Sequence, residues 1–154
     1  MKPIIKCIVL CVVILFSGCT MKKQMRIDID TYINNQASYI NKEVIIKATL
    51  EDIVSRYSLY LGKRIEISAP LTYFGSKKFW TWYILLQKDE HTLKCFTHYY
   101  RLKAANEAHN LLLRAKSKNE PIRVLGVLFK DGLEIEVFSY DGLYVDPSIY
   151  LRQR

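Results

Sequence analysis

Apolar and polar residues alternate with a period of two along several stretches of the chain, which is the pattern of half-buried strands. In EVIIKATLEDIV, residues 43–54, the apolar side chains of Val44, Ile46, Ala48 and Leu50 alternate with Glu43, Lys47, Thr49 and Glu51. This segment is predicted as the first strand. Four further strands are predicted at 80–89 (WTWYILLQKD), 92–100 (TLKCFTHYY), 121–129 (PIRVLGVLF) and 133–140 (LEIEVFSY).

A helical period replaces the alternation in two places. One apolar stripe predicts a helix from Arg101 to about Ser117, which ends before the segment KNEP. A short helix is also predicted near the start of the folded region, where either Asp28 or Asp30 can cap it. The long stripe consists of Ala105, Ala108, Leu112 and Ala115, and is widened by Leu102 and Leu111.

Residues 55–78, SRYSLYLGKRIEISAPLTYFGSKK, have no sustained period and contain two glycines, a proline and several tyrosines. Within them RIEISA, residues 64–69, is consistent with a short strand. We predict the segment as a long, partly ordered excursion between the first and second strands.

The predicted order is therefore strand, excursion, strand, strand, helix, strand, strand. Five strands with a helix between the third and the fourth are the order of the OB-fold, a small Greek-key barrel. Gly126 agrees with it, because a glycine within a strand relieves crowding where a small barrel bends. The predicted fold class is mainly β: a five-stranded OB-fold-like Greek-key barrel with a short N-terminal helix.

The start of the chain, MKPIIKCIVLCVVILFSGC, has the three parts of an export signal. Two lysines precede an apolar run of ten residues, and the small residues Ser17 and Gly18 follow it. The run is shorter than the roughly 20 residues of a membrane-spanning helix. An export signal is therefore favoured over a permanent membrane helix.

Cys19 directly follows these small residues. FSGC resembles the bacterial lipobox, with Phe16 in the place of the usual leucine. The resemblance implies that Cys19 receives a diacylglyceryl thioether, becomes the first mature residue and is usually N-acylated as well, with palmitate as the expected acyl group. Two or three acyl chains anchor a protein stably, whereas one chain holds it only marginally. We therefore expect a lipoprotein attached to the cell membrane or the outer membrane, facing the periplasm or the exterior.

The leader divides the chain and its cysteines. If Cys19 is acylated, Cys95 has no disulfide partner in the mature chain, so it is expected to be a small buried hydrophobe. The predicted parts are a signal peptide at 1–18, a lipidated tether at 19–27, an OB-fold-like domain at 28–146 and a tail at 147–154.

Three segments, YINKEVIIKATLEDI, WYILLQKDEHTLKCF and PIRVLGVLFKDGLEIEVFSY, resemble the small exported OB-fold domains of bacteria grouped as tRNA-anticodon-domain-like. The resemblance covers about residues 39–142. It departs from the group at Ala48, where a glycine is common, and in the first hairpin, which lacks a glycine. Because its motifs are apolar alternation and turns, the resemblance implies a fold and does not imply tRNA binding.

The candidate ligand site follows from the fold, since OB barrels bind ligands on the face of strands two and three. Here that face is predicted to hold Tyr83, Lys94, Phe96 and His98. Aromatic and cationic side chains together suit single-stranded nucleic acid, and tyrosine faces also stack on sugars. The excursion adds Arg56, Tyr57, Tyr60, Lys63, Arg64, Tyr73, Lys77 and Lys78.

The charge of the chain leaves several partners open. The formal net charge is +8, and a basic surface attracts nucleic acid, anionic lipid or acidic polysaccharide, or is only a solvated face. A lipoprotein outside the cytoplasm rarely meets RNA, and Glu134 and Glu136 would repel a polyanion. Nucleic acid is therefore an unlikely partner, and a protein or glycan of the envelope is favoured.

Catalysis and cofactors find little support in the sequence. His91, His98 and His109 do not have metal-ligand spacing with cysteines or carboxylates. The chain has no glycine-rich phosphate loop and no nucleophile-elbow serine. We expect no enzyme activity, no metal and no cofactor.

Two functions follow as hypotheses. The first is a membrane-anchored binding or interaction module of the envelope. The alternative is a structural or assembly lipoprotein of an envelope complex or an exclusion system, without a small ligand. An open face on strands two and three favours the first, whereas an excursion folded over that face favours the second.

Overall fold

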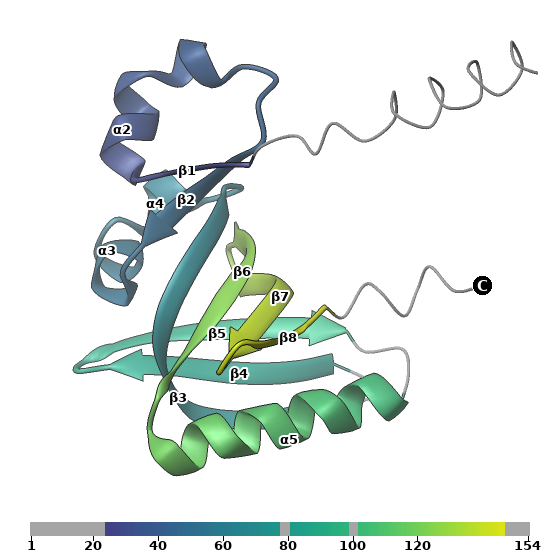
Figure 1. The fold of residues 1–154 in the computed structure, drawn as a ribbon. Coiled ribbons are helices and arrows are strands. Elements are labelled where there is room, and N and C mark those ends of the chain that lie inside the picture. Colours follow the sequence, from purple (N-terminus) through teal and green to yellow (C-terminus); the bar gives the residue numbers. More distant parts are fainter. Residues whose placement is uncertain (1–23, 78–80, 99–101, 147–154) are drawn as a thin grey trace, which may run out of the picture.

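The computed structural model describes residues 24–77, 81–98 and 102–146 (Figure 1). The predicted signal peptide, Cys19 and the tail at 147–154 lie outside the described residues. The elements are β1 Met25–Ile27, α2 Ile29–Asn34, the 3-10 helix η1 Gln36–Tyr39, β2 Val44–Ala48, α3 Leu50–Ser55, α4 Tyr57–Tyr60, β3 Arg64–Lys77, β4 Thr81–Lys88, β5 His91–His98, α5 Leu102–Lys118, β6 Pro121–Phe129, β7 Gly132–Tyr140 and β8 Leu143–Val145.

Five strands close into a ring in the order β3-β4-β5-β7-β6, and β6 pairs back with β3. Neighbours in the ring are antiparallel except β5 and β7, which are parallel. This is the strand order of the OB barrel, with α5 between its third and fourth strands, so the predicted fold class is confirmed. Outside the ring, β1 and β2 extend the sheet from β3, and β8 pairs with β7.

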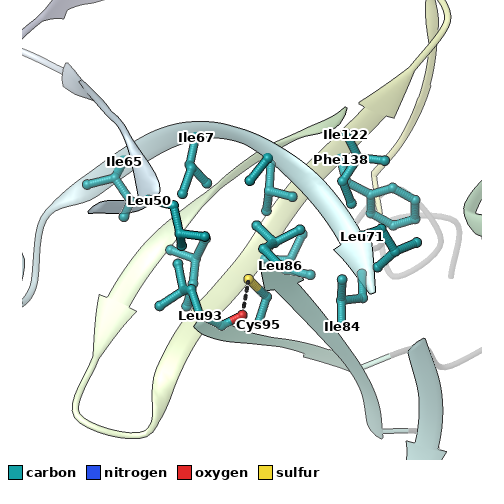
Figure 2. Close-up of a cluster of buried hydrophobic side chains, with 14 of the residues drawn as sticks. Leu50, Ile65, Ile67, Leu71, Ile84, Leu86, Leu93, Cys95, Ile122 and Phe138 are labelled. Carbon is teal, nitrogen blue, oxygen red and sulfur yellow. Dashed lines mark hydrogen bonds between the residues drawn. The ribbon is translucent and has the colours of Figure 1, made fainter. Parts of the chain in front are cut away.

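One hydrophobic cluster fills the barrel, because alternate residues of each strand point inward. Figure 2 shows side chains from β3, β4, β5, β6 and β7 meeting there, together with Leu50 of α3. Cys95 is fully buried in this cluster, as predicted, and burial raises the pKa of its thiol well above the ordinary value. The Cys95 thiol is therefore protonated and shielded.

The first strand of the barrel is not the predicted one. The strand in 43–54 ends at Ala48, and the following residues form α3. Thr49 begins the helix, since its Oγ1 accepts a hydrogen bond of 3.1 Å from the Asp52 amide. Leu50 and Ile53, three residues apart, are both buried against the barrel. The helical spacing and the cap therefore override the alternation.

The prediction that residues 55–78 form an excursion is wrong for most of the segment. Residues Arg64–Lys77 form β3, which is the first strand of the barrel. Its first half pairs with β6, and its second half pairs with β4. A register shift between Leu71 and Tyr73 interrupts the alternation where the strand changes partners. Pro70 lies beside this change of partners, pairing in register with Pro121 of β6. The excursion is thus a wall of the barrel.

Both predicted helices are confirmed. α5 buries Ala108, Leu111, Leu112 and Ala115 of the predicted stripe. Asp28 caps α2, because its Oδ1 accepts a hydrogen bond of 2.8 Å from the Thr31 amide.

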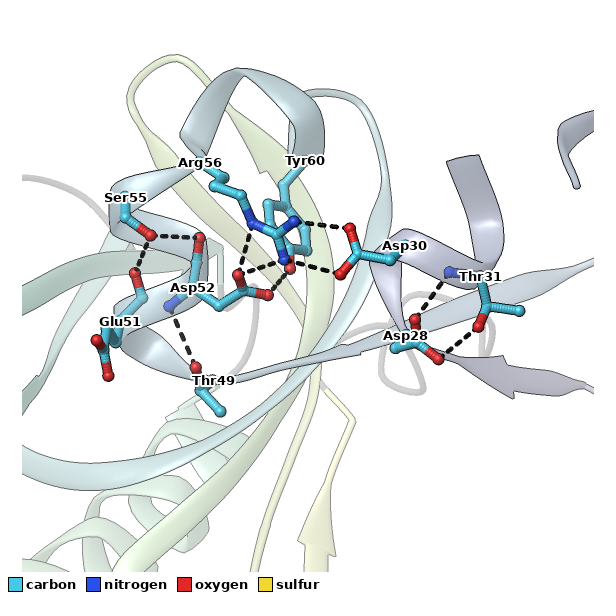
Figure 3. A network of polar contacts seen from close by, with 9 residues as sticks. All are labelled: Asp28, Asp30, Thr31, Thr49, Glu51, Asp52, Ser55, Arg56 and Tyr60. Carbon is cyan, nitrogen blue, oxygen red and sulfur yellow. Dashed lines mark hydrogen bonds and ion pairs between the residues drawn. The ribbon is translucent and has the colours of Figure 1, made fainter. Parts of the chain in front are cut away.

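The N-terminal unit, which we define as residues 25–48, is attached to the barrel by sheet pairing and by an ion-pair network. Three residues assigned to the tether, Met25–Ile27, form β1 and belong to the sheet. Arg56 bridges Asp30 of α2, at 2.7 Å, and Asp52 of α3 (Figure 3). The buried Tyr60 hydroxyl donates to the same Asp52. The network fixes α2 against α3 and α4.

None of the helices in the described part of the chain is long and apolar enough to cross a bilayer.

Candidate binding face of the barrel

Two of the predicted site residues lie side by side on the outside of the barrel. Tyr83 of β4 and Phe96 of β5 are directly opposite in the antiparallel pair, and both are half-buried. The next pair, Ile84 and Cys95, is buried in the core. Because successive side chains point to opposite faces of a strand, Tyr83 and Phe96 point outward.

Lys94 adds a cation to this face. It is exposed, and its Nζ lies 4.5 Å from the centroid of the Tyr83 ring. A cation this close to an aromatic face is attracted by the ring quadrupole, with about 0.5–1 kcal/mol at an exposed site. The contact orients Lys94 across Tyr83, so the two side chains offer a ring and a positive charge together.

Tyr73 of β3 extends the face to a third strand. In the β3–β4 pair, Gly75 lies opposite Tyr83, and the Tyr73 ring folds over Gly75. A Cβ added at Gly75 would come 2.5 Å from the Tyr73 Oη, so only glycine leaves room for this ring position. Tyr73 is 52% exposed. We call Tyr73, Tyr83 and Phe96, on β3, β4 and β5, the aromatic row.

The remaining predicted residues divide into those away from the row and those not described. Tyr60 is buried, and Tyr57 donates a hydrogen bond of 2.6 Å to the Phe129 carbonyl. Arg56 is in the ion-pair network described above, and Lys63 lies beside Tyr32. His98 pairs with Thr81 in the β4–β5 ladder, but its side chain, that of Lys77 and the whole of Lys78 lie outside the described structure.

Carboxylates border the row on the side of β7. Glu134 pairs in register with Phe96 and is exposed. Glu136, two residues further along the strand, forms an ion pair of 2.6 Å with Arg64. The face therefore combines stacking surfaces with charges of both signs, which suits a neutral or mixed-charge ligand better than a polyanion.

The described residues contain no cluster of three or more histidine, cysteine, aspartate or glutamate side chains placed to hold a metal ion. His109 of α5 instead packs edge-on against Phe74 and Trp82, with ring centroids 5.2 and 5.9 Å away. Its role in the described structure is packing of α5 on β3 and β4.

Sequence signals found part of this face. Tyr83, Lys94 and Phe96 follow from the OB-fold prediction, whose ligand face lies on strands two and three, and the structure brings them together. Tyr73 was named only as part of the excursion, and Gly75 was missed. Their signal is the Tyr-x-Gly spacing, which places both residues on one face of an extended strand.

Comparison with known proteins gives only a distant structural likeness. No family model matches the chain, and no curated protein matches it. One similar solved structure is the ZRD-deleted mutant of TiaS in complex with agmatine, with 13% identity and a TM-score of 0.41, over 67% of this chain and 31% of that one. Another is a putative aspartyl-tRNA synthetase from Leishmania major Friedlin, with 10% identity and a TM-score of 0.40, over 58% of this chain and 19% of that one. The chain thus spans less than a third of either protein, and neither similarity assigns it a function.

Proposed function

We propose that this chain is a lipid-anchored envelope protein whose barrel binds a protein or glycan through the aromatic row. The observation that carries the proposal is the row itself, in which Tyr73, Tyr83 and Phe96 cross three adjacent strands with Lys94 over the central ring. Aromatic side chains on a rigid sheet offer large contact areas at low conformational cost, and they are enriched at binding hot spots.

The position of β3 favours binding over a purely structural role. A segment folded across strands β4 and β5 would have hidden the row. Instead β3 contributes Tyr73 to it, and Tyr73 is 52% exposed. A glycan ring can stack on such tyrosines, and an apolar or aromatic side chain of a protein can pack between them.

The proposed anchor is the acylated Cys19, which rests on the lipobox resemblance of FSGC. Four residues lie between Cys19 and Gln24, where the described structure begins, so five residue-to-residue steps join the two. Even fully extended they span at most about 18 Å. Gln24, where the N-terminal unit begins, would therefore lie close to the membrane surface, and the partner of the barrel would be a component of the envelope.

The binding proposal is tested by truncating the row in the full-length chain, expressed with an affinity tag in its host. We expect Tyr73→Ala with Tyr83→Ala to lower the recovery of cross-linked partners at least about 30-fold, since one hot-spot aromatic contributes about 2 kcal/mol or more.

The matched control is Tyr144→Ala, because Tyr144 is an exposed tyrosine of β8, outside the aromatic row. It should leave recovery unchanged, and all variants should unfold at the wild-type temperature. Equal recovery from the double variant and the wild type would exclude the row and favour the structural role.

A further inference from the structure

A second candidate site lies on the N-terminal unit, away from the aromatic row. A pocket of about 270 Å³ is lined by Tyr32, Tyr39, Lys42, Lys63 and Arg64, among others. Pockets for drug-sized ligands have volumes of about 300–1,000 Å³, so this one suits a small polar group. We call it the tyrosine–lysine pocket.

The charged residues that line the tyrosine–lysine pocket are all cationic. Arg64 pairs with Glu136, but neither Lys42 nor Lys63 forms an ion pair with any described residue. The Lys63 Nζ lies 4.8 Å from the Tyr32 ring centroid and 3.3 Å from the Tyr32 Oη. Two lysines without carboxylate partners beside hydroxyl donors are the chemistry that binds a phosphate.

Two other described pockets differ in this respect. One combines Arg123 with Asp141, and the other combines Arg114 with Glu107. Their opposite charges would partly cancel toward an anion. The tyrosine–lysine pocket has no acidic lining residue, so among these three it is the pocket that favours an anion.

A tight turn beside the pocket exposes an apolar side chain. The Lys42 amide donates a hydrogen bond of 3.0 Å to the Tyr39 carbonyl, and Asn41 has a φ of 63°. These are features of a type II turn, in which Ile40 takes position i+1 and Asn41 takes position i+2. Ile40 is 68% exposed, although both ends of its turn line the pocket.

The pocket is built on supported elements. Tyr32 and Tyr39 stack with ring centroids 5.8 Å apart and planes 9° from parallel. Arg56 fixes α2, which carries Tyr32, through its ion pair with Asp30 (Figure 3). The two tyrosines, and with them the first residue of the turn, are thus held in a defined arrangement, which lowers the cost of ordering a binding site.

We propose that the turn Tyr39–Lys42 and the tyrosine–lysine pocket form a membrane contact for an anionic phospholipid. Ile40 enters the interfacial region, and Lys42 and Lys63 bind the headgroup phosphate. Apolar insertion together with lysines near an anionic surface is how peripheral segments bind bilayers. The inference rests on the proposed anchor at Cys19, which limits Gln24, at the start of this unit, to about 18 Å from the bilayer surface.

The test places a polarity-sensitive fluorophore on Ile40→Cys in the mature protein purified from membranes. Labelling is selective, because the proposed lipid occupies the Cys19 thiol, and Cys95 is fully buried with a raised thiol pKa. The labelled protein is reconstituted into vesicles of phosphatidylcholine alone or with phosphatidylglycerol, each with or without brominated lipid as a quencher. Tyr144→Cys is the matched label position, since Tyr144 is also 68% exposed.

We expect a blue-shifted, quenched signal from position 40 only with phosphatidylglycerol, and an aqueous signal from position 144 in both vesicles. Lys42→Gln with Lys63→Gln should abolish the shift. Lys88→Gln with Lys118→Gln, which removes the same charge from exposed lysines elsewhere, should preserve it. An aqueous signal from position 40 in vesicles that retain the protein would overturn the contact while leaving the anchor intact.

Two further outcomes separate the anchor from the contact. If the protein carries no lipid, it is tested for flotation with phosphatidylglycerol vesicles. Flotation that is lost in the Lys42→Gln, Lys63→Gln variant would still support the contact. No flotation of the wild type would overturn it. A separate experiment measures the binding of soluble glycerol phosphate. Saturable binding of glycerol phosphate, without any response to vesicles, would assign the pocket to a free phosphate ester and overturn the membrane assignment.

Discussion

Replacing Gly126 with alanine is expected to destabilise the protein by at least about 3 kcal/mol, the upper end of the cost of overpacking. Gly126 lies in β6 beside a register shift against β7, and a Cβ there would come 2.1 Å from the Glu134 carbonyl oxygen. That oxygen belongs to backbone that cannot yield without opening the β6–β7 pair. A domain has only about 5–15 kcal/mol of net stability, so the substitution would remove about a fifth to three-fifths of it.

Chemical denaturation followed by tryptophan fluorescence measures this effect. The matched control is Gly142→Ala, where an added Cβ has no atom within 4 Å and only the positive φ of 73° is unfavourable. It should cost about 1–2 kcal/mol. Equal denaturation midpoints for the two variants would contradict the close approach of β6 and β7 at Gly126.

Exchanging Cys19 for serine is expected to abolish lipid attachment. The thiol is the proposed site of the diacylglyceryl thioether, and without it the cleaved and acylated form cannot arise. Each buried methylene contributes about 0.8 kcal/mol to membrane binding, so losing all the acyl chains removes the anchor completely. Cells labelled with a palmitate analogue should show a labelled wild type and an unlabelled Cys19→Ser variant.

The control variant is Cys7→Ser with Cys11→Ser. Both cysteines lie in the predicted signal peptide, which is removed if the lipobox prediction is correct. This variant should be labelled like the wild type. Labelling that survives in Cys19→Ser would contradict the anchor and, with it, the proposed envelope location.

Much of the barrel could be predicted because its signals are local. β5 and β7 alternate, β4 and β6 are short apolar runs between turn residues, and α5 has an unbroken apolar stripe. Their order is sufficient to indicate the OB-fold without knowledge of which strands pair. Gly126 was also predicted correctly as a point of crowding, which the close Glu134 carbonyl confirms.

The first barrel strand could not be predicted because its signal is divided between two partners. β3 pairs with β6 in one half and with β4 in the other, and its alternation shifts between Leu71 and Tyr73. Pro70 and Gly75 also favour a loop by composition. Conversely, 43–54 alternates well enough to imitate the first strand, although the Thr49-x-x-Asp52 spacing is a helix-capping signal.

The sequence predicted those residues of the candidate site whose position depends on a single strand. Tyr83, Lys94 and Phe96 required only that β4 and β5 be predicted as strands two and three of an OB barrel. The third member of the row, Tyr73, depends on the pairing of Gly75 with Tyr83, which joins residues of different strands. The tyrosine–lysine pocket depends likewise on bringing Lys63 to Tyr32, residues 31 positions apart.

The central claim, that the anchored barrel works through the aromatic row, is tested most directly by photo-cross-linking in living cells. A benzophenone amino acid replaces Tyr83 in one strain and Tyr144 in another, in the full-length chain. The account predicts discrete cross-linked products from position 83 that position 144 does not give. No product from position 83, or the same products from both positions, would contradict it.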